Sequence, residues 1–332
     1  MLVSVAGPIA ARPAGAPRAA PRGPMSAEAR FALTARLAGA TAALMFALIV
    51  VGSIVRTTGS GLACPDWPLC HGRWIPPFQF NILIEWFHRL LALVVGLGLL
   101  GTAVSVFARR ETRARLGGLA ALSLALYVSQ ALLGALTVWK LLDPGVVSGH
   151  LAVALLLFAT LLALGLIARH ESRPAPPAAR APGLRTWFAL TSVAVWAQAV
   201  LGGMVSTNHA SLACPDWPTC HGAWFPPLTG LVGLQMAHRY GAYLLILLVA
   251  LVASRARATP DPVVRRLGFT LLGLVLVQAG VGVANVFLGI PVWVSAVHLA
   301  LATLLLALAL TATFRLSAAR AAERSLAGAP AR

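Results

Sequence analysis

Eight apolar stretches, each long enough to cross a membrane, constrain this chain more than any other feature of its sequence. They cover roughly residues 33–55, 83–106, 117–138, 147–168, 185–206, 234–253, 266–288 and 292–315. About 20 apolar residues suffice for a helix to cross a bilayer, and a helix satisfies its own backbone hydrogen bonds in lipid. Charged residues make up only 11% of the chain, against roughly 25% in soluble domains. We therefore expect an all-α membrane protein with eight transmembrane helices.

The basic residues predict how these helices are oriented. The chain carries 26 Lys and Arg against 9 Asp and Glu, a formal net charge of +17. Most basic residues lie in the two tails and in alternate connections; the exceptions are Arg56, Arg73, Arg89, Lys140 and Arg239. Because basic loops stay in the cytoplasm, we expect both termini there, in a cell inner membrane or, as the less favoured alternative, a mitochondrial one. The charge is a topology signal and requires no nucleic acid partner.

The segments outside the apolar stretches are expected to form tails and a linker. Residues 1–32 are rich in Ala, Pro and Arg, which predicts a disordered cytoplasmic tail. This tail lacks the apolar core of a signal peptide, although an organellar targeting sequence is an alternative. Met25 is a plausible second start. Residues 169–184 are the expected linker, and residues 316–332 a second cytoplasmic tail.

An internal repeat divides the chain into two halves. The segment VGSIVRTTGSGLACPDWPLCHGRWIPP at 51–77 recurs as LGGMVSTNHASLACPDWPTCHGAWFPP at 201–227, an offset of 150 residues. Each half holds an even number of spans, so the halves share one orientation, as in a parallel repeat with a pseudo-two-fold axis along the membrane normal. We expect two four-helix bundles, residues 33–168 and 185–315, with both matched loops on the non-cytoplasmic side.

Four histidines lie inside the apolar stretches at repeat-related places: His88, His150, His238 and His298. Each falls near the start of a span that enters from the non-cytoplasmic side, so all four are expected at a similar depth. Ionisable residues within a membrane are costly and usually functional. Two facing histidines in a four-helix bundle suit the axial ligation of a heme iron, whereas zinc wants more ligands. The alternative is a set of histidines hydrogen-bonded between helices.

The residues beside the first histidine of each pair distinguish the two halves. Glu85 precedes His88 by three residues, on the same helix face, whereas its repeat partner is Gln235. This difference favours a chemical site in the first half and an electron-transfer heme in the second. Arg89 and Arg239 each follow a histidine and are candidates for pairing with heme propionates. Snorkelling to the lipid headgroups is the alternative.

All four cysteines lie in the two matched loops: Cys64, Cys70, Cys214 and Cys220. An oxidising compartment permits disulfides, and among the three possible connectivities the repeat favours one bridge within each loop. The C-x5-C spacing is neither the redox motif C-x-x-C nor the heme-attachment motif C-x-x-C-H. A structural bridge and a redox-active one are both open. His71 and His221 follow the second cysteines, which leaves a loop metal site as a minor alternative.

Together these motifs resemble the heme A synthase family. The resemblance rests on eight spans in two halves, the E-x-x-H of Glu85 and His88, and single histidines in alternate spans. Cysteine pairs in the first and third outer loops are similar to those of bacterial members. It covers residues 33–315. It implies an enzyme that oxidises the C8 methyl group of heme O to a formyl group, giving heme A for terminal oxidases.

The resemblance also implies residue roles and partners. His88 and His150 would hold the substrate heme beside a catalytic Glu85, and His238 and His298 would ligate a resident heme b. A heme O synthase and terminal oxidase assembly are the implied partners, with membrane lipid around the chain and homo-oligomerisation open. Two other classes remain: a di-heme cytochrome b in quinol-linked electron transfer, and a heme transporter or chaperone. A pure electron carrier has no need of Glu85.

Overall fold

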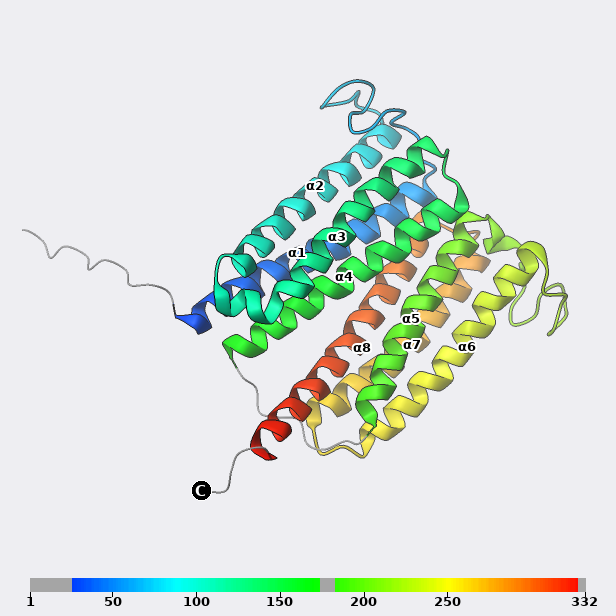
Figure 1. Ribbon diagram of the computed structural model, residues 1–332. Coiled ribbons are helices and arrows are strands. Elements are labelled where there is room, and N and C mark those ends of the chain that lie inside the picture. The colour runs from blue at the N-terminus through cyan, green and yellow to red at the C-terminus, as the bar shows by residue number, and fades with distance from the viewer. Residues whose placement is uncertain (1–25, 174–182, 328–332) are drawn as a thin grey trace, which may run out of the picture.

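The computed structural model describes residues 26–173 and 183–327 of the chain. Within these residues lie eight α-helices and a short 3-10 helix: α1 (Ala27–Thr57), α2 (Phe80–Phe107), α3 (Arg110–Trp139), α4 (Pro144–Ser172), α5 (Leu184–Thr207), η1 (Ala210–Leu212), α6 (Gly230–Arg257), α7 (Pro262–Phe287) and α8 (Val292–Ala327). Each α-helix is long and apolar enough to cross a membrane. The prediction of an all-α protein with eight membrane-spanning helices is therefore confirmed (Figure 1).

The helices extend past the apolar stretches that predict them. The N-cap Ser26 starts α1 ahead of the first stretch, α4 continues to Ser172, and α8 continues to Ala327. Apolarity ends where the lipid ends, whereas a helix continues until its backbone is capped, so the expected linker loses residues 169–172 to α4. Helix α1 likewise takes residues 27–32 of the expected tail 1–32, and α8 takes residues 316–327 of the expected tail 316–332. Residues 1–25 with the second start at Met25, residues 174–182 and residues 328–332 lie outside the described residues.

The helices of each half pack in the same cyclic order. In the first half α1 contacts α2 and α4, and α3 contacts α2 and α4; in the second half α5 contacts α6 and α8, and α7 contacts α6 and α8. Contacts of α1 with α8, of α4 with α5 and of α4 with α8 join the halves. Figure 1 shows α2 and α3 on one side of the molecule and α6 and α7 on the other. The inner helices α1, α4, α5 and α8 therefore form the seam between the halves.

One continuous apolar core runs through the seam. It includes Leu155 of α4, Phe188 of α5, Val249 of α6 and Leu305 of α8, all essentially inaccessible to solvent. Residues 33–168 and residues 185–315 are thus consecutive in sequence, and both contribute to the largest cluster of buried apolar side chains. The pseudo-two-fold relation between them stays a prediction.

The loops after α1 and after α5 lie at the same end of the molecule and share one internal structure (Figure 1). Disulfides join Cys64 to Cys70 and Cys214 to Cys220, with Cα atoms 4.7 Å apart in both. This confirms one bridge within each loop. The buried sulfur atoms pack on Ile82 of α2 and on Met236 of α6. Each loop is therefore docked on the first turns of a helix that carries one of the four histidines.

An aspartate holds the turn within each loop. The carboxylate of Asp66 accepts hydrogen bonds from the backbone N–H groups of His71 (2.6 Å) and Gly72 (2.8 Å), and Asp216 accepts the same two bonds in the second loop. Donors that favour the charged form lower a carboxyl pKa. The N–H of Gly72 lowers the pKa of Asp66 the most, followed by that of His71 and the charge of Arg89. The turn therefore keeps its anionic acceptor at neutral pH.

Candidate functional site

A cavity of about 950 Å³ opens at the loop end of the molecule and is lined by residues of both halves. All the predicted membrane-embedded site residues line it: the four histidines His88, His150, His238 and His298, and beside them Glu85, Gln235, Arg89 and Arg239. Alternate helices α2, α4, α6 and α8 present the histidines, each within about two turns of the helix start. Side chains that are far apart in sequence thus meet around one enclosed space.

The starts of these helices fix the depth of the histidines. For α4, Pro144 occupies the first turn and Asp143 accepts hydrogen bonds from the N–H groups of Gly145 (2.9 Å) and Val146 (3.0 Å). Proline at the first turn and an acidic N-cap are strong helix-starting signals. His150 therefore follows a firmly fixed start and faces the cavity from the second turn.

The histidine rings of the second half lie at a spacing that suits a shared metal ion. The ring centres of His238 and His298 lie 6.5 Å apart, with the ring planes inclined at 74°. Two metal–nitrogen bonds of about 2 Å each would separate opposed imidazole nitrogens by roughly 4 Å and the ring centres by about 6 Å. The observed spacing is therefore compatible with an iron atom between the two rings.

Each histidine ring packs on a glycine of a neighbouring helix. The pairs are Gly52 with His88, Gly134 with His150, Gly202 with His238, and Gly282 with His298. A Cβ atom on Gly202 would lie 2.8 Å from Cε1 of His238, and one on Gly282 would lie 2.9 Å from Cε1 of His298. Both distances are shorter than real Cβ contacts. The sequence repeat includes these glycines, but only the packing shows that they make room for the imidazoles.

Glutamine side chains lie beside the buried imidazoles. Nδ1 of His238 lies 3.0 Å from Nε2 of Gln198, which also donates to the backbone carbonyl of His238 at 2.7 Å. Nε2 of His150 lies 3.2 Å from Nε2 of Gln130. Since an amide nitrogen only donates, the ring nitrogen is the acceptor in both contacts, and each contact restrains the orientation of an imidazole. Sequence reasoning missed Gln198, because a single polar residue in an apolar span does not reveal which helix face meets its neighbour.

Two of the histidines keep an unpartnered nitrogen. Nδ1 of His150 and Nδ1 of His298 are buried and have no hydrogen-bond partner among the described residues. Buried polar atoms are normally paired. The same nitrogen is buried in both histidines, so the two halves hold these repeat-related rings alike.

Glu85 lies at the centre of a polar network that the sequence does not predict in detail. One carboxylate oxygen accepts from the backbone N–H of Cys64 at 2.8 Å, and the other pairs with Nη2 of Arg89 at 2.6 Å. Glu85 therefore pairs with the arginine one turn further along α2. Among the described residues that line the cavity, Glu85 is the only carboxylate.

Arg89 and Arg239 both anchor their disulfide loops. Arg89 donates to the carbonyls of Asp66, Leu69 and Cys64, and Arg239 donates to those of Asp216, Thr219 and Cys214. Gln235, in the place of Glu85, donates to the carbonyl of Ser211 at 3.3 Å. The terminal nitrogens of both arginines are therefore engaged with the protein backbone, and propionate binding by either residue stays a prediction.

The loop histidines are turned toward their own loops. Nε2 of His71 lies 2.9 Å from the carbonyl oxygen of Ala63, and Nε2 of His221 lies 3.0 Å from that of Ala213. Within residues 26–173 and 183–327, no group of three or more His, Cys, Asp or Glu side chains is arranged to hold a metal ion. In the part of the chain that the structure describes, the loop histidines therefore belong to no cluster of metal-binding side chains.

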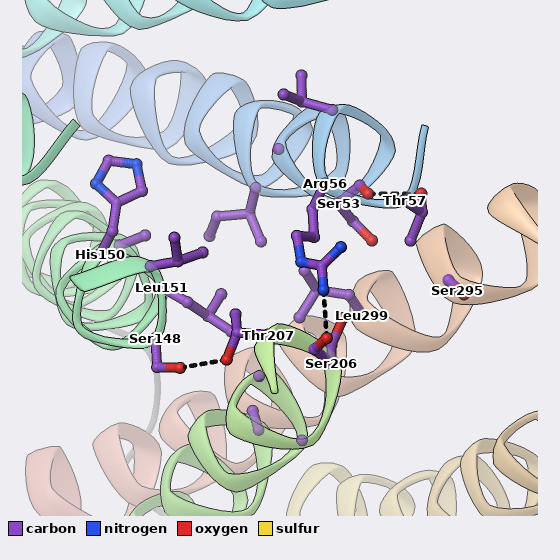
Figure 2. A pocket seen from close by; sticks show the side chains of 18 of the residues that line it. Ser53, Arg56, Thr57, Ser148, His150, Leu151, Ser206, Thr207, Ser295 and Leu299 are labelled. Carbon is purple, nitrogen blue, oxygen red and sulfur yellow. Dashed lines mark hydrogen bonds between the residues drawn. The ribbon is translucent and has the colours of Figure 1, made fainter. Parts of the chain in front are cut away.

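Arg56 is a cavity residue that sequence reasoning mentions only as an isolated basic residue. It lies in the last turn of α1, and its Nη2 donates a hydrogen bond to the carbonyl oxygen of Ser206 on α5. Figure 2 shows its side chain between α1 and α5, with His150 on the same cavity. The repeat could have identified Arg56, because the corresponding residue of the second half, 150 positions later, is the uncharged Ser206.

Comparison with known proteins finds one family across most of the chain. The profile of the COX15-CtaA family, described as cytochrome oxidase assembly protein, matches residues 35–81 and 77–310. The chain is 33% identical over 321 residues to a heme A synthase of Methylobacterium radiotolerans, covering 81% of this chain and 86% of the relative. It is 30% identical over 273 residues to a heme A synthase of Geobacillus kaustophilus, covering 79% and 84%.

Proposed function

Because this chain belongs to the COX15-CtaA family of cytochrome oxidase assembly proteins, we propose that it is a heme A synthase. It is an oxidoreductase that converts the C8 methyl group of heme O to a formyl group and so provides heme A for terminal oxidases. The observation that carries the proposal is the convergence of four repeat-related histidines, with a single carboxylate, on one cavity.

The second half is the site of a resident heme b. His238 and His298 would hold it, which the ring centres 6.5 Å apart and the two glycines that admit the rings support. When bound, this heme supplies one-electron transfer. Gln198 holds the ring of His238 in place, since its amide nitrogen lies 3.0 Å from Nδ1 and donates to the backbone carbonyl of the same residue. Gln235 keeps this half free of a carboxylate at the position of Glu85.

The first half holds the substrate, heme O, between His88 and His150. Glu85 is the catalytic residue, since a carboxylate beside the reacting group accepts a proton or stabilises developing positive charge. Its contacts with Arg89 and with the N–H of Cys64 fix its position at the cavity wall. These contacts also tie Glu85 to the disulfide loop, so the loop and the carboxylate hold one another in place.

The disulfide loops act as covers over the cavity. Trp67, Leu69 and Trp74 of the first loop and Trp217 of the second line its mouth. Apolar side chains there exclude water, which strengthens electrostatic interactions within the site. The disulfides are structural in this proposal, because they fix the loop carbonyls that receive Arg89 and Arg239.

The protein is a multi-pass membrane protein, and we place it in the cell inner membrane with both termini in the cytoplasm. Its cavity then opens toward the non-cytoplasmic side, where an oxidising compartment preserves the disulfides. A heme O synthase supplies the substrate, and terminal oxidase assembly consumes the product.

Co-expression with a heme O synthase, followed by extraction and chromatography of the hemes, tests the proposed function. A synthase yields heme A from cells that otherwise accumulate heme O, and the purified protein retains heme b. Purified protein with heme b alone, and no heme A in the cells, would instead indicate a di-heme cytochrome. Substoichiometric heme without conversion would indicate a transporter or chaperone.

A further inference from the structure

The cavity carries an excess of positive charge. Its charged lining residues among those described are the cations Arg56, Arg73, Arg89 and Arg239, and the single anion Glu85. Arg89 is neutralised by Glu85 and bonded to loop carbonyls, and Arg239 is bonded to loop carbonyls. Arg56 lies in the last turn of α1, and its side chain reaches the carbonyl of Ser206 on α5 (Figure 2). The lining as a whole therefore favours an anionic ligand.

Arg56 has unused hydrogen-bonding capacity. A guanidinium offers five N–H donors, and within the described residues Arg56 donates only one hydrogen bond, from Nη2 to the carbonyl of Ser206. No carboxylate of the described residues lies within salt-bridge distance of it. A partly buried cation without an anionic partner is costly. Its remaining donors therefore point to a partner that enters the cavity.

The position of Arg56 along α1 assigns it to the first histidine pair. Gly52, against which the ring of His88 packs, precedes Arg56 by four residues. Residues four apart lie on one helix face, and the rise between them is about 6 Å. Arg56 therefore lies on the face of α1 that meets His88, one turn closer to the loop end.

The repeat shows that this cation is particular to the first half. Ser206 occupies the position of Arg56, just as Gln235 occupies that of Glu85. Ala223 likewise occupies the position of Arg73, and Arg56, Arg73 and Glu85 all line the cavity. Around Arg56 the seam is polar: Ser148 and Thr207 share a hydrogen bond of 3.0 Å, and Figure 2 shows this pair close to the Arg56–Ser206 contact. Polar neighbours of this kind suit a ligand carboxylate rather than an apolar tail.

We propose that Arg56 binds a propionate carboxylate of the tetrapyrrole held between His88 and His150. The inference rests on the proposed function, because it takes an iron tetrapyrrole as the occupant of the first half. A guanidinium binds a carboxylate with two parallel hydrogen bonds, which an ammonium does not reproduce. Arg56 thus selects a substrate with a free carboxylate and sets its orientation in the cavity.

Titration of the purified protein, loaded with its resident heme b, tests this proposal. The probes are iron protoporphyrin IX and its dimethyl ester, which lacks free carboxylates. Loss of a charge-assisted pair weakens binding by about tenfold or more. We expect Arg56→Gln to weaken binding of the diacid by that amount and to leave the diester within about threefold of the unmodified protein. Arg56→Lys should recover part of the affinity for the diacid.

Lys140→Gln is the matched control, because it removes one exposed positive charge at the same end of the molecule, outside the cavity. It should leave both affinities unchanged. Equal weakening of diacid and diester by Arg56→Gln, or no weakening of either, would overturn the proposal. If Arg56→Gln loses its resident heme, the two probes are compared on the unmodified protein alone. Equal affinities for the diacid and the diester would then contradict carboxylate recognition.

The outcome is separable from that of the proposed function. Unmodified protein that prefers the diacid through Arg56, yet forms no heme A in co-expression, would retain the carboxylate site and reject the synthase. Unmodified protein that forms heme A, but binds both probes equally, would retain the synthase and reject the role of Arg56. Failure to bind either probe at all would overturn the carboxylate site.

Discussion

At Glu85 the observed contact with the loop and the proposed handling of a proton can be tested separately. Glu85→Gln keeps the shape of the side chain and copies Gln235, which is accommodated in the other half. We expect normal expression and normal heme b, and heme A formation reduced by about a hundredfold or more. Accumulation of a hydroxylated intermediate would accompany the loss.

Heme extraction after co-expression with a heme O synthase measures this effect. Glu111→Gln is the control, since it breaks an exposed ion pair of 3.2 Å with Arg30. Near-normal heme A from Glu85→Gln would return Glu85 to a purely structural role, in which it only joins the loop to α2.

The four histidines are expected to respond in two groups. His238→Ala or His298→Ala should remove the proposed heme b from purified protein, because each variant removes one of the two side chains that would hold its iron. His88→Ala or His150→Ala should leave that heme largely in place and abolish heme A formation. Reduced-minus-oxidised absorption spectra measure the retained heme.

His170→Ala serves as the control for the histidine variants. This residue belongs to the last turn of α4, and its ring lies 6.0 Å from that of Phe314. The variant should change neither heme content nor turnover. Equal loss of heme from all four cavity variants would contradict the division between the halves.

At the scale of single elements, the sequence predicts those features that depend on residues close together in the chain. Apolar length predicts all eight spans, and the repeat predicts the pairing of Cys64 with Cys70 and of Cys214 with Cys220. The contacts of Arg89 with loop carbonyls, and of Gln198 with His238, depend on how elements pack across tens of residues. No local pattern encodes such contacts, so the sequence identifies the cavity residues but not their bonding.

The close approach of helices around the histidines makes the glycines a further test. Gly282→Ala places a Cβ atom 2.9 Å from Cε1 of His298 and should displace the ring, lowering heme b content or altering its spectrum. Gly280→Ala lies on the same helix with nothing within 4 Å of its Cβ atom, so it should be silent. Absorption and electron paramagnetic resonance spectra distinguish the two. Identical spectra would show that the glycine does not position the imidazole.

At the scale of the whole molecule, the expected orientation is open to direct labelling. Phe225 is 87% exposed in the second disulfide loop, and Arg110 is exposed at the opposite end. With the four native cysteines held in disulfides, Phe225→Cys or Arg110→Cys carries a single free thiol. We expect an impermeant maleimide to label Phe225→Cys in intact cells and Arg110→Cys only after permeabilisation. The reverse pattern would invert the topology and place the cavity mouth in the cytoplasm.

The contact between Arg56 and Ser206 illustrates what joining two similar bundles in one chain allows. Two identical chains paired about a symmetry axis must carry the same residue on both sides of their shared boundary. Arginines in both positions would repel each other, and serines in both would leave the boundary neutral. When both halves belong to one chain, the two sides of the boundary need not carry the same residue. Each side of the boundary can change alone, so one scaffold can come to bind two different ligands while the halves keep the same packing.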